Sequence, residues 1–456
     1  MKKRQTVIVF GFLLLCNFLR ASEIKINSLK ELATYAAKSG NTIVMAPGVY
    51  QMKEYLTTEV IKNIVPDEIG RYAMIKFSGN HNVFDFTGVT IEVDTKLLSV
   101  FKARVSEFYV EGSHVHIKGL TVTDIGNHPT AKGGHSFTVA GDDAVIEKVT
   151  LNMSGSFPYG YGDLLGKGKG ALVPLKKHSG MCIEGLNDKI KDCSIYSKSY
   201  GHCFFVQGGR NVLFENCYAE GVTRTTDDML SEISGPAFDV NFASVYKNYA
   251  GENIITPGYT KSLNECGFRM YGKGGVNAIK TGAVTAINCT AKNTRIGFAF
   301  AKISGDVLIK DSKAIGCELG YYVEGLTVEN SIGDAANGPL LYVNKGEKTT
   351  VEIALLPTEA KTKVHVLAAI AGDNHNITLT NWRNLKRGQQ LPIKIGVTHP
   401  PANNSFSPLG TAKTTAVVLK NTTGMPVELN SETSLCEVFS NAAVKDKGTN
   451  NLINKK

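Results

Sequence analysis

Cysteine recurs at a regular spacing in the middle of this chain. The segments 180–193 and 203–217 each contain an apolar run, a turn rich in Gly and Asn, a second alternating run and a terminal Cys. The interval from Cys217 to Cys289 is three times the interval from Cys193 to Cys217. This spacing indicates a short structural repeat.

The repeat extends in both directions. Ser312 follows Cys289 at almost the same interval as the one between the first two cysteines, and Val149 takes the equivalent place once an insertion at about 154–177 is allowed. A period of about 24 residues is too short for a propeller blade and matches one coil of a right-handed parallel β-helix. Because stacking aligns equivalent residues, we expect the repeated cysteines to form an inward ladder of free, buried thiols.

The start of the repeat has its own signals. Ser28 and Glu31 form a capping box that opens an amphipathic segment, which ends at Gly40. The strand-like segment that follows ends in Pro-Gly-Val-Tyr, at Tyr50. We expect one helix to cap the first coil and protect its edge from pairing with another chain.

These residues resemble the amino-terminal segment of parallel β-helix polysaccharide lyases and related pectin-lyase-like carbohydrate-active proteins. In that family a capping helix precedes a strand that ends in Pro-Gly-x-Tyr. The resemblance implies an all-β fold, a right-handed parallel β-helix with an N-terminal capping helix, and a carbohydrate substrate.

The chain is expected to be exported. Three basic residues at 2–4 precede an apolar run at 7–15, and Ala21 is suited to cleavage, so residues 1–22 are predicted to be a signal peptide. The alternative, a lipid anchor at Cys16, is disfavoured by the large Leu15 before it. The mature protein should then be periplasmic, extracellular or on the outer surface.

The remaining chain is predicted to be one elongated domain and a monomer. Residues 23–345 should form the β-helix, with loop insertions at about 154–177 and 221–265, and residues 346–456 should form irregular C-terminal coils of the same domain. No later run approaches about 18 apolar residues, so no membrane span is expected.

The charge of the chain suits a polyanionic partner. The sequence has 50 Lys and Arg against 41 Asp and Glu, a formal net charge of +9. Neither a zinc-finger spacing nor an RNA-recognition motif is present, so no nucleic acid is expected and an acidic polysaccharide or oligosaccharide is the predicted ligand.

Histidines next to the two insertions are the leading candidates for a site. His178 precedes Cys193 by the same interval as His202 precedes Cys217, so the two histidines should stack on neighbouring strands. His135 falls one position from this column. Imidazoles beside cationic groups can bind a carboxylate and move a proton near neutral pH.

The leading hypothesis is β-elimination from a uronic-acid polymer. This reaction requires neutralisation of a carboxylate, removal of the adjacent proton and protonation of the leaving oxygen. Arg224 or Arg269 could perform the first task, His178 or His202 the second, and a Tyr or Lys the third. The predicted catalytic residues are His178, His202, Arg224, Tyr161, Asp227 and Asp228. The predicted substrate-binding residues are His135, Lys176, Lys177, Arg269, Tyr159 and Lys273.

Two alternatives remain open. An inverting glycoside hydrolase could use Asp227, Asp228 or Asp239 as its acid and base. Pectin-hydrolysing β-helix enzymes are similar in having an Asp-Asp pair and a Gly-His, but their Gly-His follows the pair, whereas His202 precedes it here. The chain could also be a non-catalytic glycan-binding solenoid.

No cofactor is predicted. A flat ladder of histidines converges poorly on zinc unless Asp142, Asp143 or a loop carboxylate joins it. Calcium would instead require clustered oxygen ligands, of which Asp227 and Asp228 could supply two.

Overall fold

The computed structural model describes residues 23–156, 162–166, 171–274, 278–357, 362–383, 389–400 and 403–455. The predicted signal peptide, Cys16, Tyr159 and Tyr161 lie outside these ranges. No helix in the described ranges is long and apolar enough to cross a membrane.

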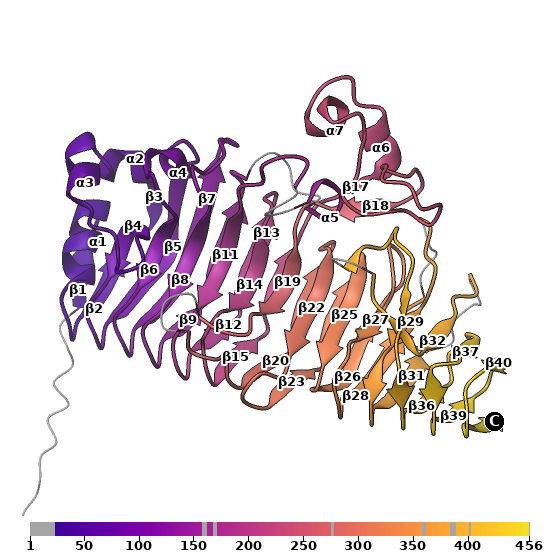
Figure 1. The fold of residues 1–456 in the computed structure, drawn as a ribbon. Coiled ribbons are helices and arrows are strands. Elements are labelled where there is room, and N and C mark those ends of the chain that lie inside the picture. The colour runs from indigo at the N-terminus through magenta and orange to yellow at the C-terminus, as the bar shows by residue number, and fades with distance from the viewer. Residues whose placement is uncertain are drawn as a thin grey trace, which may run out of the picture.

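The chain forms a right-handed parallel β-helix, as the repeat predicts (Figure 1). Within the two long sheets, strands pair in parallel with their equivalents in the next coil, so the coils stack along one axis. Sheet B contains 13 of the described strands: β4 (Tyr72–Phe77), β6 (Val105–Val110), β8 (Gly134–Val139), β11 (His178–Ile183), β14 (His202–Val206), β19 (Cys266–Met270), β22 (Ile296–Ala301), β25 (Leu319–Glu324), β27 (Leu341–Val343), β29 (Ala368–Ile370), β32 (Ile393–Ile395), β37 (Val427–Leu429) and β40 (Val444–Asp446).

Sheet A forms most of the other walls of the coils, and a short parallel sheet of β30 (Gly372–Asp373), β35 (Thr414–Thr415) and β38 (Thr433–Ser434) adds to them in the late coils. Sheet A contains 21 of the described strands: β1 (Glu23–Ile26), β2 (Thr42–Met45), β3 (Gly48–Gln51), β5 (Val83–Asp94), β7 (His116–Ile125), β9 (Val145–Glu147), β10 (Thr150–Met153), β12 (Lys189–Lys191), β13 (Ser194–Ser197), β15 (Val212–Glu215), β16 (Tyr218–Glu220), β20 (Val284–Ile287), β21 (Thr290–Lys292), β23 (Val307–Lys310), β24 (Lys313–Ile315), β26 (Thr327–Gly333), β28 (Thr350–Leu355), β31 (Asn376–Asn381), β36 (Val418–Asn421), β39 (Glu437–Ser440) and β41 (Leu452–Lys455). Strands from β28 onward continue both sheets through the late coils.

Short helices lie at the N-terminal end and on the loops. The first, α1 (Leu29–Ala36), is capped by Ser28, whose side chain accepts a hydrogen bond from the backbone N–H of Glu31. Leu29, Leu32 and Ala36 on its inner face are buried in the main core. The other described helices are α2 (Met52–Tyr55), α3 (Thr58–Asn63), α4 (Leu97–Val100), α5 (Gly162–Leu165), α6 (Thr226–Leu230) and α7 (Pro236–Asp239).

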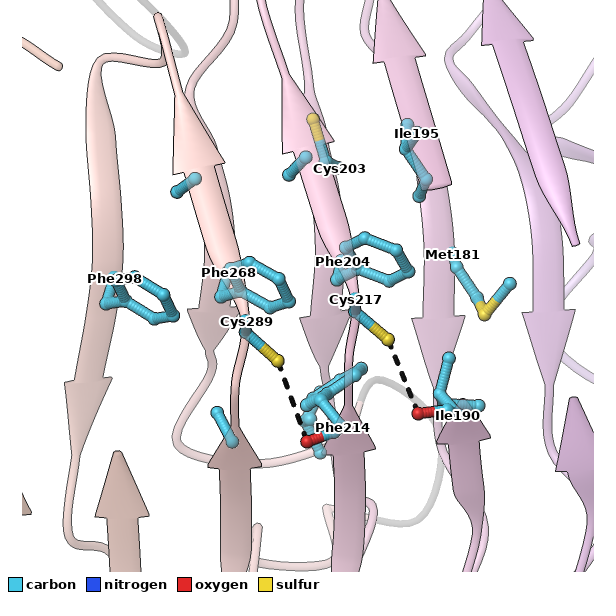
Figure 2. Close-up of a cluster of buried hydrophobic side chains, with 14 of the residues drawn as sticks. Met181, Ile190, Ile195, Cys203, Phe204, Phe214, Cys217, Phe268, Cys289 and Phe298 are labelled. Carbon is cyan, nitrogen blue, oxygen red and sulfur yellow. Dashed lines mark hydrogen bonds between the residues drawn. The ribbon is translucent and has the colours of Figure 1, made fainter. Parts of the chain in front are cut away.

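The interior of the coils is filled by ladders of equivalent side chains. The buried rings of Phe204, Phe268 and Phe298 stack with centroids 5.1 Å and 4.9 Å apart (Figure 2). Stacked rings combine apolar burial with favourable offset contacts. The predicted cysteine ladder is confirmed, since the thiols are free and buried and backbone hydrogen bonds join Cys193 to the coil of Cys217 and Cys217 to that of Cys289.

The interval between Cys217 and Cys289 spans one coil, so its interpretation as three coils is wrong. The strands that directly follow these two cysteines, β16 and β21, pair with each other. The additional residues leave the solenoid as an excursion that contains α6 and α7 and an antiparallel pair, β17 (Thr223–Thr225) with β18 (Thr260–Ser262). Figure 1 shows this excursion projecting from the solenoid.

The two predicted insertions pack against each other. Side chains from both, together with one from a late loop, form a separate apolar cluster that contains Leu164, Leu165, Met229, Ala237, Ile255, Tyr259 and Phe406. Another apolar cluster buries the outer face of sheet B toward the C-terminus, with Cys266, Ile296, Leu319 and Tyr342 among its members. The candidate site lies over earlier coils, where the outer face of sheet B carries polar side chains such as His135 and His202.

A second ladder runs along one turn of the coils. Asp192, Asn216 and Asn288 all have left-handed backbone conformations, with φ of 52°, 56° and 51°. The side-chain amide of Asn216 donates to Asp192 Oδ1 at 2.9 Å, and that of Asn288 donates to Asn216 Oδ1 at 2.8 Å. Asn tolerates this conformation because its short polar side chain can bond locally.

Replacing Asn216 should therefore separate backbone strain from hydrogen bonding. Asn216→Ala loses the ladder bonds and places a Cβ in a left-handed conformation, so we expect a loss of about 1–3 kcal/mol in the free energy of unfolding. Asn216→Gly removes the same bonds without that strain and should cost less. Urea unfolding of both variants tests this, and equal losses would contradict it.

Candidate active site

A cavity of about 360 Å³ lies over the polar part of sheet B. Three basic side chains, two histidines and two aromatic rings line it. The lining residues are Arg104, Lys132, Gly133, Gly134, His135, Leu175, Lys177, Ser179, His202, Phe205, Gln207 and Tyr271. Since the described residues of this lining include no carboxylate, the cavity favours an anionic ligand.

His202 and Tyr271 form a close pair in this cavity. His202 begins β14, and Tyr271 directly follows β19, the next strand of sheet B. His202 Nε2 lies 2.6 Å from the Tyr271 hydroxyl and 3.2 Å from Glu265 Oε2. Burial and the nearby Glu265 carboxylate raise the pKa of Tyr271, so its phenol stays neutral near neutral pH.

Glu265 lies beneath the pair and connects it to cations. Its side chain is fully buried and forms ion pairs with Lys177 and Arg295, and its Oε1 accepts a hydrogen bond from the Tyr200 hydroxyl at 3.1 Å. Such a carboxylate can orient His202 and stabilise its protonated form.

His135 joins His202 through one aromatic ring. The centroid of Phe205 lies 5.2 Å from that of His135 and 5.6 Å from that of His202. Burial and the charge of Arg104 hold the pKa of His135 well below its usual value, so His135 is neutral near neutral pH. Arg104 and Lys132 are exposed, next to the starts of β6 and β8.

The predicted stacking of His178 on His202 is wrong. In sheet B His178 pairs with Gly134, whereas Ser179 pairs with His135, so Ser179 occupies the strand position expected for His178. Ile183 pairs with Val206, 23 residues on, whereas Lys189 pairs with Leu213, 24 residues on, so the turn after β14 has one residue more than the turn after β11. Equal spacing from Cys193 and Cys217 therefore does not place His178 and His202 at equivalent strand positions. A shift of one residue moves a strand side chain to the other face.

His178 instead lies in a buried cluster with Glu107 and Asp124. Its Nε2 lies 3.1 Å from Glu107 Oε1, and its Nδ1 lies 3.4 Å from Asp124 Oδ2. Burial lowers the pKa of His178, but the charges of Asp124 and Glu107 outweigh burial and raise the pKa to about 9. One atom from each side chain lies within 4.8 Å of the other two, so the cluster could hold a metal ion.

The candidate residues of the excursion lie outside the cavity lining. Arg224 forms an ion pair with Glu232 and donates to the backbone oxygen of Asp228 at 2.8 Å. Asp227 and Asp228 are exposed in the first turn of α6, and Asp239 is exposed at the end of α7.

Only some of the other predicted binding residues lie at the cavity. Lys177 lines the cavity, but its neighbour Lys176 does not. Arg269 pairs with Phe205 in register, and its guanidinium lies 5.1 Å from the centre of the Tyr271 ring. Lys273 is exposed in the following turn.

A larger cavity of about 550 Å³ lies near the other ends of the early sheet B strands. Its principal cation, Arg71, is 2.7 Å from Asp67 Oδ2 and 2.7 Å from Glu184 Oε1. Because these charges compensate one another, this cavity lacks the net positive character of the smaller one.

Sequence reasoning missed Arg104, Lys132, Glu265 and Tyr271 as site residues. Tyr271 lies two residues after Arg269, a predicted binding residue, so its place just beyond the same strand was a usable signal. Glu265 ends an insertion and Arg104 precedes a strand whose register depends on earlier turns. Neither residue has a periodic signal in the sequence.

No protein-family model and no curated protein sequence matches this chain. Among solved structures, the chain is similar to a PL6 alginate lyase in complex with a trisaccharide, at 11% identity over 94% of this chain and 87% of that one, with a TM-score of 0.47. It is also similar to a rhamnogalacturonan lyase, at 14% identity over 80% of each chain, with a TM-score of 0.42.

A tailspike protein of E. coli bacteriophage HK620, in complex with a hexasaccharide, gives a comparable match. The identity is 11% over 94% of this chain and 73% of that chain, and the TM-score is 0.46. These likenesses include lyases and a tailspike, so they do not select one activity. The strand pairing establishes the fold, and the side chains of the cavity must carry the functional argument.

Proposed function

We propose that the protein cleaves an acidic polysaccharide containing uronic acid by β-elimination. The observation that carries this proposal is the 2.6 Å contact between His202 Nε2 and the Tyr271 hydroxyl in a cavity whose described lining has three cations and no carboxylate. The predicted signal peptide supports export to a compartment where such polymers occur.

The cations supply the first requirement of elimination. A proton next to a carboxylate becomes acidic when positive groups stabilise the developing enolate-like charge. Arg104 and Lys132 are exposed at the cavity, where they can meet the carboxylate of an incoming sugar unit. Lys177 lies deeper and is already paired with Glu265.

The close pair supplies the proton transfers. His202 takes the proton from the carbon next to the carboxylate, and Tyr271 gives its hydroxyl proton to the leaving oxygen. The proton then passes from the imidazolium of His202 to the phenolate of Tyr271 through their hydrogen bond, which restores both groups. Glu265, at 3.2 Å from His202 Nε2, stabilises the intermediate imidazolium.

The same lining disfavours the hydrolase alternative. Inverting hydrolysis requires two carboxyl groups about 6.5–9.5 Å apart around the scissile bond. The carboxylates considered for it, Asp227, Asp228 and Asp239, are exposed on the excursion helices. Glu265 is the carboxylate next to His202, and its ion pairs hold it beneath the cavity.

Product chemistry tests the proposal. We expect incubation with uronic-acid polymers to produce ultraviolet absorbance, because elimination creates an alkene conjugated with the carboxylate. A neutral polysaccharide serves as the matched control and should give none. New reducing ends without absorbance would indicate hydrolysis, and binding without either signal would indicate a glycan-binding solenoid. Both outcomes would contradict the proposal.

A further inference from the structure

The buried cluster of Glu107, Asp124 and His178 joins both sheets of the solenoid. Glu107 lies on β6 and His178 on β11, both in sheet B, whereas Asp124 lies on β7 in sheet A. The side chains of Glu107 and His178 are 0% exposed and that of Asp124 is 1% exposed. Three titratable groups in such surroundings are costly unless each one is compensated.

Each side chain of the cluster has one polar atom that makes a hydrogen bond to a neighbouring residue outside the cluster, and this bond orients the side chain. Glu107 Oε2 accepts a hydrogen bond from Ser136 Oγ at 2.6 Å. Asp124 Oδ2 accepts one from the backbone N–H of Ser154 at 2.7 Å, and His178 Nδ1 lies 2.5 Å from the Ser154 carbonyl oxygen. A donated Nδ1–H would leave the lone pair of the ring on Nε2.

The remaining polar atoms of the cluster have few partners. Among the described residues, Asp124 Oδ1 is buried without a hydrogen-bonding partner, and Glu107 Oε1 and His178 Nε2 have only their 3.1 Å ion pair with each other. Buried polar atoms are usually satisfied, so this arrangement requires an explanation. Histidine and carboxylate ligands of metals are typically oriented in this way, by hydrogen bonds to the atoms that do not bind the ion.

We propose that Glu107, Asp124 and His178 bind a single zinc-class divalent ion. One nitrogen and two carboxylate oxygens match the ligands of zinc, whereas calcium prefers six to eight oxygens. The 3.1 Å between His178 Nε2 and Glu107 Oε1 is close to the roughly 3.4 Å edge of a tetrahedron of ligands about 2.1 Å from zinc.

A cavity on the side of sheet A lies next to the cluster. It has a volume of about 430 Å³ and is lined by Asp124, Asn152 and Ser154, among other residues. Because the side chain of Asp124 is only 1% exposed, its carboxylate is closed off from this cavity, and a bound ion would be shielded from solvent. The bound ion would fix β11 against β6 and β7. Lys177 and Ser179, on either side of His178, line the cavity of the candidate active site.

Zinc titration of the metal-stripped protein tests the site directly. The protein is treated with a chelator, dialysed, and titrated with zinc against a chromophoric competitor. We expect one equivalent to bind the unaltered protein, and Glu107→Gln to weaken this binding at least tenfold. His114→Asn, which removes an exposed histidine, is the matched control and should bind like the parent protein.

A second variant controls for misfolding, and a spectroscopic measurement controls for metal binding at another site. Ser136→Ala removes only the hydrogen bond that orients Glu107, so it should weaken zinc binding about 10–100-fold while the fold is kept. Bound cobalt should show no thiolate charge-transfer band, since the site lacks cysteine. A thiolate band, unchanged affinity in both variants, or the absence of stoichiometric zinc would each overturn the proposal. These readouts do not depend on enzymatic activity.

Discussion

His202→Gln should reduce kcat for uronic-acid polymer cleavage by at least 100-fold. A positioned general acid or base contributes about 10²–10⁴-fold to the rate, and His202 carries two proton transfers in the proposed mechanism. Tyr271→Phe, which removes only the hydroxyl 2.6 Å from His202, should cause a loss of similar size. The initial rate of ultraviolet-absorbing product formation measures both effects.

The double variant distinguishes a pair that acts as a unit from two independent groups. If the proton passes between His202 and Tyr271, removing both should cost little more than removing either one. His116→Gln is the matched control, because His116 lies on sheet A with 32% of its side chain exposed. Full activity of correctly folded His202→Gln would refute the assigned mechanism, whichever polymer is cleaved.

Phe268→Ala should destabilise the protein by about 3–5 kcal/mol. Phe268 is fully buried between Phe204 and Phe298, so its removal leaves a cavity and breaks two ring contacts. Rigid stacking of coils above and below limits how far the neighbouring strands can collapse into that space. The free energy of unfolding from urea denaturation, or the melting temperature, measures the loss.

An exposed phenylalanine provides the comparison. Phe238 on α7 is 44% exposed, and Phe238→Ala should change the free energy of unfolding by less than about 1 kcal/mol. Equal losses for the two variants would mean that the aromatic ladder contributes little beyond ordinary surface packing.

The fold could be predicted from the sequence because the coils repeat. The interval from Cys193 to Cys217 reappears as the register offset between β13 and β16, and inward residues recur in columns. The interval from Cys217 to Cys289 led to a wrong number of coils, because the excursion adds residues to the chain without adding coils. Spacing alone does not distinguish three coils from one coil and a long insertion.

The candidate site was harder to predict from the sequence, because strand register depends on turn lengths that the sequence does not show. Which face a strand residue occupies depends on every turn before it, so one additional turn residue exchanged the expected positions of His178 and Ser179. Glu265 and Tyr271 reach His202 from a coil that lies beyond the excursion. The whole excursion separates these groups in the sequence, whereas the parallel ladder brings β14 and β19 together.

The rate at which each interior thiol is alkylated reports how often its part of the solenoid opens. The eight cysteines of the described chain are free and buried, and burial raises the pKa of Cys317 to about 12. Thiols react as thiolates, so an alkylating reagent can modify each one only when its surroundings open. Mass spectrometry of timed alkylation would therefore reveal the order in which the coils from Cys182 to Cys436 come apart.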